Sequence, residues 1–148
     1  MSAKNNKDVI IEKLFDASLQ NIWDAWTNAE IIKQWFGSDP NGTVTYVALD
    51  VKPGGFFTVT FKDSDGTEHT CSGVYKEVIP MQKLCFTWQW KSEPGLVSLV
   101  TVSFRHEEFC TRMLFTHEQL HASYQHAYQE GWQRTFGKLE KVINKVRS

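Results

Sequence analysis

The sequence predicts an α+β fold in which a curved antiparallel sheet of about six or seven strands wraps around one long C-terminal helix. The last stretch, residues 123–146, carries a continuous apolar stripe at helical spacing. Between residues 44 and 117, short segments alternate apolar and polar residues, which is typical of strands. No other segment resembles a second long helix, so strands must cover the stripe. A chain of 148 residues suits one core, and we expect a single domain over residues 1–148.

The N-terminal region predicts one strand followed by two short helices. The strand covers residues 8–17, and apolar side chains on both of its faces favour a strand that is covered on both sides. The helices cover residues 19–26, capped by Ser18, and residues 29–36, preceded by a capping box over residues 27–30. Such a pair can also read DNA. This pair is aromatic and apolar with only one Lys, so we expect it to close one end of the sheet.

Six further strands are predicted, and the short connections between them favour an antiparallel meander. Asp65-Gly66 is the strongest hairpin signal in the chain, and Pro80 ends the strand that follows it. The expected strands cover residues 44–51, 55–62, 70–79, 83–90, 96–107 and 110–117.

Alternation in the later strands predicts one apolar face and one polar face. The polar face includes Arg112 and Thr116, which we expect to face solvent. A sheet that wraps around a single helix requires one solvent-exposed face and one apolar face. The residues expected on the inner face are Leu84, Phe86, Trp88, Trp90, Val100, Val102, Phe104, Thr111, Met113, Phe115 and His117.

The C-terminal helix has large apolar residues at steps of three or four, and we expect Ser123 to cap it. Burying five such side chains contributes on the order of 10 kcal/mol as an upper bound. Gly131 costs about 1 kcal/mol against Ala inside a helix, so we expect a close backbone contact with the sheet there. The stripe consists of Tyr124, Tyr128, Trp132, Phe136, Leu139, Ile143 and Val146.

Charge and composition argue against several classes of partner. The net charge is −1, with 16 basic and 17 acidic residues interspersed, so no basic surface for nucleic acid or an anionic membrane is predicted. The first residues lack the apolar core of a signal peptide, and no apolar run is long enough to span a bilayer. The three cysteines have no CxxC spacing. We therefore expect reduced thiols, a cytoplasmic protein and no stable membrane association.

Residues 117–121 match the HExxH pattern of zinc proteases. That chemistry needs both histidines on one face of a helix, with the glutamate acting on a metal-bound water. Alternation predicts instead that His117 ends a strand and that residues 118–122 form a loop. Three fixed positions also arise easily by chance, so we predict no metal and no cofactor.

Several side chains could serve as general acids or bases, but no nucleophile–base pair occurs at a recognisable spacing. His117 has the inner parity and is expected to be a hydrogen-bonded histidine in the core or at its rim. Asp50, beside a Gly-Gly turn, is expected to bond turn amides. We therefore predict no catalytic residue. The candidates are Asp50, His69, Glu77, Arg112 and His117.

The order of these elements resembles the helix-grip fold of the START/pollen-allergen-like (SRPBCC) superfamily, and within it the family related to the activator of heat-shock protein 90 ATPase. Six pieces in the right order carry the resemblance over nearly the whole chain. The matching segments are Ile22-Trp23-Asp24-Ala25-Trp26-Thr27 with Trp35-Phe36-Gly37, Asp50 with Pro53-Gly54-Gly55-Phe56, residues 73–80, Leu84-Cys85-Phe86-Thr87-Trp88, Thr111-Arg112-Met113 through Thr116-His117, and Gly131-Trp132.

The resemblance implies a hydrophobic cavity between the sheet and the long helix. The chain has six Trp and ten Phe, and spacing alone leaves open whether these rings line a pocket or fill a solid core. The resemblance favours a pocket. The residues expected to line it are Trp35, Tyr75, Phe86, Trp88, Phe104, Met113, Phe115, His117, Tyr128, Trp132 and Phe136.

Three functions are compatible with this prediction, because the fold alone does not imply one activity. The first is non-catalytic binding of a small hydrophobic molecule in the cavity. The second is a cyclase- or dehydratase-like enzyme using the same cavity, which predicts a buried titratable pair at its floor. The third, by family analogy alone, is a module that contacts a chaperone through an exposed apolar patch. The co-chaperones that name the family carry an additional N-terminal domain, for which 148 residues leave no room.

Overall fold

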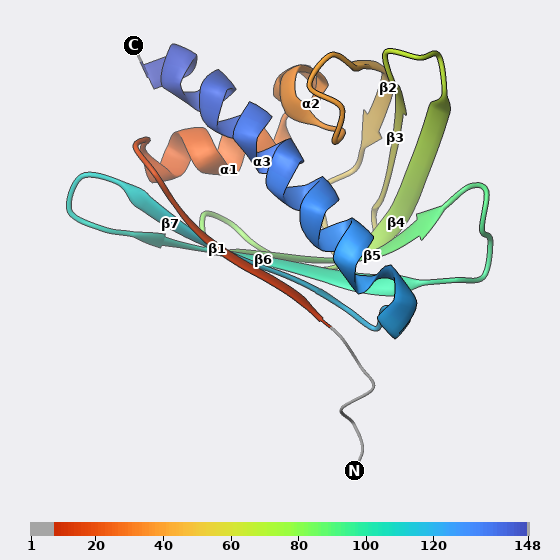
Figure 1. Ribbon diagram of the computed structural model, residues 1–148. Helices are drawn as coiled ribbons and strands as arrows, with labels where there is room; N and C mark the ends of the chain where they lie inside the picture. The colour runs from red at the N-terminus through yellow and green to blue at the C-terminus, as the bar shows by residue number, and fades with distance from the viewer. Residues whose placement is uncertain (1–7, 148) are drawn as a thin grey trace.

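One seven-stranded antiparallel sheet and three α-helices make up the computed structural model, which describes residues 8–147 (Figure 1). Only the backbone is described for Ala122 and residues 144–147, so the predicted burial of Val146 lies outside the described side chains. The elements are β1 (Val9–Phe15), α1 (Leu19–Thr27), α2 (Ala29–Trp35), β2 (Thr43–Leu49), β3 (Phe56–Lys62), β4 (Glu68–Ile79), β5 (Lys83–Trp90), β6 (Ser98–His106), β7 (Thr111–Glu118), the 3₁₀ helix η2 (Ala122–Tyr124) and α3 (Gln125–Arg147).

The sheet is the predicted meander with the first strand added at its far edge. Its strand order is β1-β7-β6-β5-β4-β3-β2, and every neighbouring pair is antiparallel. The register of β4 against β5 shifts between Tyr75 and Glu77. Near this bend, a Cβ on Gly73 would collide with the carbonyl oxygen of Thr87, so the close approach of the two strands requires glycine. The sheet curves, and α3 runs across its concave side (Figure 1).

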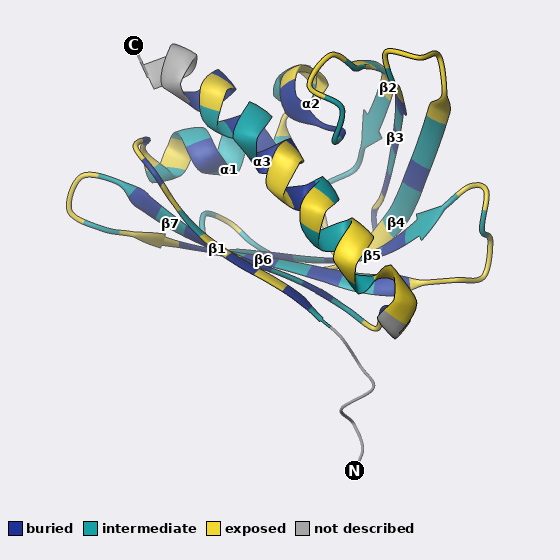
Figure 2. Cartoon of the chain, in the orientation of Figure 1, coloured by how far each residue is buried: buried dark blue, intermediate teal, exposed yellow. Residues whose placement is uncertain are grey.

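The predicted burial of the inner face of β5 to β7 is confirmed, with Trp90 partly buried, and so is that of the central stripe of α3. Tyr124, the first residue of the predicted stripe, is instead 41% exposed and lies in the 3₁₀ helix before α3. Trp132, Phe136 and Leu139 are at most 5% exposed, and buried segments alternate with exposed ones along α3 (Figure 2). The predicted cap is wrong, because α3 begins at Gln125 and Ser123 lies in the preceding 3₁₀ turn. There the Nδ1 atom of His121 accepts the backbone N–H of Ser123 at 3.1 Å.

The two short helices close one end of the sheet, as predicted. Ser18 caps α1 by accepting the N–H of Asn21, and Asn28, rather than the expected Thr27, caps α2 by accepting the N–H of Glu30. The indole N–H of Trp35 donates to the buried carbonyl of Ala25 at 3.0 Å, which ties α2 to α1. Both helices pack against α3.

The prediction that β1 is covered on both faces is wrong. Its inner side chains, such as Phe15, are buried, whereas Ile10 is 62% and Leu14 48% exposed. The physical reason is the single-layer sheet, since the helices lie on its concave side and leave the convex face to solvent (Figure 1). Edge strands tolerate such residues when charged neighbours interrupt them.

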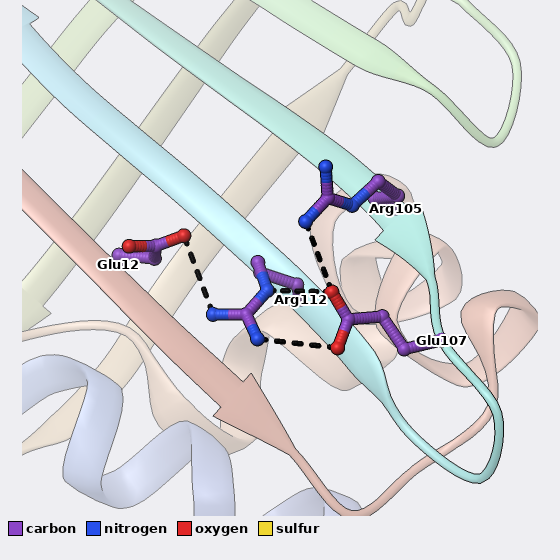
Figure 3. Close-up of polar contacts among 4 residues, drawn as sticks. All are labelled: Glu12, Arg105, Glu107 and Arg112. Atoms are coloured by element: carbon purple, nitrogen blue, oxygen red, sulfur yellow. Dashed lines mark hydrogen bonds and ion pairs between the residues drawn. The ribbon is translucent and has the colours of Figure 1, made fainter.

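Those charges form a network on the convex face, where Arg112 points to solvent as predicted (Figure 3). Its guanidinium binds both carboxylate oxygens of Glu107, at 2.6 and 3.1 Å, and also reaches Glu12 on β1 at 3.3 Å. Arg105 on β6 donates to the same Glu107 at 3.0 Å. The hydrogen bonds from Arg112 and Arg105 lower the pKa of Glu107 to about 2. The network therefore links three adjacent strands.

Candidate functional site

A pocket of about 280 Å³ opens between the N-terminal half of α3, strands β3 and β5, and the segment that follows α2. This volume lies just below the usual range for small-molecule sites, roughly 300–1,000 Å³. Seven of its thirteen lining residues are aromatic, and we refer to it as the aromatic pocket. It is lined by Phe36, Gly37, Ser38, Phe61, Trp88, Trp90, Glu93, Tyr124, Ala127, Tyr128, Gly131, Trp132 and Thr135.

The pocket exists because one face of α3 carries small residues beside its rings. Ala127, Gly131 and Thr135 follow one another at steps of four and all line the pocket. The expected close contact of Gly131 with the sheet is wrong. A methyl group there would meet only the Cβ atom of Ser38, at an ordinary 3.8 Å. The glycine leaves space, which larger side chains would fill.

The outer wall of the pocket is attached to α3 by a lysine. The ammonium of Lys138 donates to the carbonyl oxygen of Asp39 at 2.9 Å and to that of Phe36 at 3.5 Å. Partial burial lowers the pKa of Lys138. The Asp39 carboxylate accepts the backbone N–H and the hydroxyl of Ser64. These bonds fix the segment that carries three lining residues.

Behind the pocket, a chain of hydrogen bonds joins α3 to three strands. The indole N–H of Trp132 donates to Nδ1 of His117 at 3.0 Å, and Nε2 of His117 lies 2.7 Å from Oγ of Ser98. An indole can only donate, so Nδ1 is unprotonated and Nε2–H donates to Ser98. The Ser98 hydroxyl in turn donates to the carbonyl of Trp88 at 3.4 Å. Burial lowers the pKa of His117 to about 3, in agreement with a neutral imidazole.

Tyr128 places a hydroxyl in the pocket wall. Its oxygen accepts the indole N–H of Trp90 at 2.7 Å. The N–H of Trp88 is buried and has no acceptor in bonding geometry among the described residues. It nevertheless lies close enough to the Tyr128 oxygen to oppose the rise in the pKa of Tyr128 that burial causes. Two indole donors therefore surround one phenolic oxygen.

A second, small hollow of about 20 Å³ lies deeper, beneath α2 and β3 to β5. Its volume suits about one water molecule. The hollow and the aromatic pocket both border on Phe36 and Trp88, whose rings stack at 6.1 Å. Burial raises the pKa of Tyr75 in its lining, and nearby Asp50 raises it further.

The structure distributes the predicted site residues over three places. The aromatic pocket includes Trp88, Tyr128 and Trp132. The small hollow includes Trp35, Tyr75, Phe86 and again Trp88. The remaining five are buried and line neither space in the described chain: Phe104, Met113, Phe115, His117 and Phe136.

Sequence reasoning missed ten of the thirteen lining residues. A signal was present in α3, where the small residues Ala127, Gly131 and Thr135 follow one another at helical spacing beside Trp132. Trp90 was expected on the inner face but was not assigned to the site. For the segment after α2 no local signal exists, because its place depends on a contact with Lys138, 99 positions away from Asp39.

The HExxH match does not have the geometry of a zinc site. His117 lies in β7, with both ring nitrogens bonded to Trp132 and Ser98. His121 follows in the loop and bonds Ser123. Within residues 8–147, no group of three His, Cys, Asp or Glu side chains is placed to hold a metal ion.

The other acid–base candidates are not lining residues, although the ring of His69 packs against Phe61 and Trp90 of the lining, at 5.2 and 5.9 Å. His69 pairs with Asp63 at 2.8 Å, and Glu77 pairs with Lys83 at 2.9 Å. Asp50 does not bond turn amides with its carboxylate as expected. Its backbone carbonyl accepts the N–H of Lys52, and its carboxylate lies 3.7 Å from the Lys52 ammonium. The ionisable groups in the lining itself are one carboxylate, Glu93, and two phenols.

Sequence comparison gives one family match. The model of the activator of Hsp90 ATPase homolog 1-like protein family matches residues 16–144. Comparison with functionally curated proteins gives no match. No described helix is long and apolar enough to cross a bilayer.

Solved structures share the fold over nearly the whole chain. A protein from Nitrosomonas europaea is 20% identical, with a TM-score of 0.82 over 98% of this chain and 97% of that one. A protein from Staphylococcus aureus is 24% identical, with a TM-score of 0.78 over 97% and 98%. The AHSA1-like protein from Aeromonas hydrophila is 20% identical, with a TM-score of 0.80 over 94% and 93%. At these identities the likeness shows the fold alone.

Proposed function

Since the chain belongs to the activator of Hsp90 ATPase homolog 1-like family, we propose that it binds a small hydrophobic molecule in the aromatic pocket, without covalent chemistry. The observation that carries this proposal is the pocket itself, with its volume of about 280 Å³ and its seven aromatic lining residues. Burial of apolar ligand surface would supply the binding free energy, at roughly 25 cal/mol per Å². Trp88, Tyr128 and Trp132 are the predicted site residues that we retain in this role.

The same pocket gives less support to an enzyme. A general base needs a free lone pair within reach of the substrate. His117 packs against Tyr128 and Trp132, uses Nδ1 to accept from Trp132 and carries its proton on Nε2. His69 packs against Phe61 and Trp90 and is paired with the Asp63 carboxylate at 2.8 Å. Among the lining residues, a cyclase- or dehydratase-like reaction would have to rely on Glu93 or a phenol.

A chaperone contact receives less support than ligand binding. Exposed apolar residues do occur on the convex face, including Ile10, Leu14 and Leu114. The ion pair between Arg112 and Glu12 lies among them, because Glu12 is paired with Leu114 and Leu14 with Arg112 in the strand register. A cytoplasmic location remains part of the proposal, supported by three free cysteines.

Two glycines in α3 provide a matched test of ligand binding. Gly131 lines the aromatic pocket, whereas Gly137 does not and has open space around its Cβ position. We expect the neutral dye N-phenylnaphthylamine to bind saturably, with increased emission, to the wild type and to Gly137→Leu. Gly131→Leu should weaken binding at least about tenfold, because its side chain occupies the pocket.

The titration needs a check on folding, which circular dichroism and thermal melting of both variants provide. A flat titration of the wild type, across this dye and a panel of neutral polycyclic compounds, would count against the proposal. Equal binding by both leucine variants would place any bound dye outside the aromatic pocket.

A further inference from the structure

We propose that the aromatic pocket selects an uncharged, planar ligand with a hydrogen-bond acceptor, such as a ketone or quinone oxygen, to which Tyr128 donates its hydroxyl proton. This inference rests on the proposed function, because it specifies the chemistry of the molecule that the pocket would hold. Three features of the lining support it: the fixed polarity of Tyr128, an unsatisfied indole N–H, and the sign of the charge at the pocket.

The hydroxyl of Tyr128 is held as a donor. Its oxygen accepts the N–H of Trp90 at 2.7 Å, and an indole N–H cannot accept a proton in return. The N–H of Trp88 lies near the same oxygen. The hydroxyl proton therefore points away from both indoles. Since Tyr128 lines the pocket, an acceptor on a bound molecule can take that proton.

The indole N–H of Trp88 supports an acceptor at the same place. Trp88 is only 3% exposed, and its Nε1 atom has no hydrogen-bond partner among the described residues. The Nε1 atom is itself covered and lies near the Tyr128 oxygen, so it reinforces the donor polarity of the Tyr128 hydroxyl. An oxygen seated in the pocket beside Tyr128 would therefore meet the hydroxyl proton.

The charge at the pocket argues against anions. Glu93 is the only charged side chain in the lining as described, and no ion pair in the described chain joins it to a Lys or Arg. Its negative charge acts on the pocket interior, because it contributes to the raised pKa of Tyr128. Lys138, the nearby cation, is bonded to backbone carbonyls outside the lining. A carboxylate or phosphate ligand would therefore meet repulsion without a compensating cation.

The rings determine the shape of the ligand. Trp88, Trp132 and Phe36 approach one another at centroid distances of 5.1 to 6.1 Å and form a wall of aromatic faces and edges. Aromatic side chains bind flat π-systems by offset stacking and edge-to-face contacts. A planar ligand therefore uses this wall better than a flexible chain of the same area.

Three naphthalene probes of nearly the same shape test the inference. Acetylnaphthalene carries a neutral acceptor, isopropenylnaphthalene replaces the carbonyl oxygen by a methylene group, and naphthoate carries a negative charge. Isothermal titration calorimetry gives the affinities, and proton–nitrogen correlation spectra report the indole N–H signals. We expect acetylnaphthalene to bind about tenfold more tightly than isopropenylnaphthalene, and naphthoate to bind more weakly than acetylnaphthalene.

Variants assign the effects to residues. Tyr128→Phe should remove the difference between the two neutral probes, whereas Tyr46→Phe, on exposed β2, should preserve it. Glu93→Gln should strengthen naphthoate binding severalfold, and any change in acetylnaphthalene binding should be much smaller. Glu108→Gln, in the distant β6–β7 loop, is the matched charge control. Thermal melting identifies a variant that fails to fold, and Glu93→Gln tests the inference independently of Tyr128.

The outcomes separate this inference from the proposed function. Equal affinity for both neutral probes would overturn the donor assignment while leaving hydrophobic binding in place. Tightest binding of naphthoate would overturn the exclusion of anions. If none of the three probes bound, the proposed function would fail together with the inference.

Discussion

At the scale of single residues, His117 is the polar group on which the packing of α3 against the sheet depends. It is fully buried, and it receives a hydrogen bond from Trp132 while donating one to Ser98. The bond from Trp132 requires a neutral ring, because a proton on Nδ1 would face the indole N–H, whereas Nε2–H donates to Ser98 in either charge state. Buried polar groups are stable only when every donor and acceptor is matched, and protonation would break that match.

Protonation of His117 predicts a specific loss of stability in mild acid. The pKa is 6.5 in the unfolded chain and about 3 in the folded one, so the unfolded state takes up the proton first. The contribution is therefore complete above pH 6.5 and decreases as the pH falls from 6.5 toward 3. Between pH 6.5 and 4.5, the wild type should lose roughly 2 kcal/mol that His117→Gln does not lose. Urea unfolding at several pH values measures this difference.

Glutamine suits the substitution because its amide can accept from Trp132 and donate to Ser98 without titrating. His126→Gln provides the control, since the side chain of His126 is 82% exposed on α3. If His117→Gln followed the same pH curve as the wild type, another group would account for the acid sensitivity.

The convex-face network allows a second prediction at this scale. Glu107 stays charged down to a pH of about 2, so its contribution is present above the ordinary pKa of 4.5 and is lost as the pH falls through 2. At neutral pH, Glu107→Gln should lower the urea midpoint slightly in low salt. The difference should shrink in about 1 M salt, where exposed charges are screened over roughly 3 Å. Glu108→Gln is the control; a salt-independent loss would indicate lost packing instead.

At the scale of elements, α3 combines two functions along one helix. Its C-terminal half buries large residues such as Phe136 and Leu139. Its N-terminal half places small residues over the aromatic pocket. Glycine in a helix interior is unfavourable by about 1 kcal/mol relative to alanine. Gly131 and Gly137 are therefore positions where stability can be gained.

Alanine should stabilise the helix at both positions. Gly131→Ala and Gly137→Ala should each raise the free energy of unfolding by up to about 1 kcal/mol, because neither methyl group meets an atom closer than 3.8 Å. Thermal and urea unfolding measure the gain. Only Gly131→Ala should also change ligand affinity. A destabilising Gly131→Ala would mean that Ser38 cannot accommodate the methyl group.

The elements were predictable from the sequence to a much greater extent than the pocket. The stripe of α3 and the alternation of β5 to β7 depend on neighbours in the sequence, and the structure confirms both. The exposure of Ile10 and Leu14 was not predictable, because an apolar face indicates burial only where a second layer exists. The pocket depends on the absence of a side chain at Gly131 and on the hydrogen bonds by which Lys138 holds the Phe36–Asp39 segment. Periodicity describes neither feature.

At the scale of the whole molecule, the two halves of α3 differ in how many buried apolar side chains they pack against the rest of the protein. The C-terminal half buries Phe136, Leu139, Val142 and Ile143, whereas Trp132 is the one buried apolar side chain described in the N-terminal half, which lies beside the pocket. Local stability follows the density of buried apolar contacts. The end that we propose to bind ligand is therefore the end with fewer packed neighbours, and a ligand would add the contacts that it lacks.

Ligand binding should accordingly stabilise one end of the molecule. At a free concentration of 100 times Kd, acetylnaphthalene should raise the unfolding free energy by about 2.7 kcal/mol. Amide hydrogen exchange should slow in residues 124–135 and in the segment after α2. Strand β1, at the far edge of the sheet, should change little in its local exchange. Uniform protection with no local maximum would argue against binding in the aromatic pocket.

The stacked rings of Phe36 and Trp88 separate two spaces that would otherwise be continuous. Phe36 comes at the end of α2 and is followed by Gly37, whose φ of 104° lets the chain turn sharply there. A rotation of the Phe36 side chain, or its shortening to alanine, would join the pocket to the hollow near Tyr75. If the pocket binds a ligand as proposed, the Phe36 and Trp88 rings would limit the length of that ligand, and a smaller side chain at position 36 would admit a longer one.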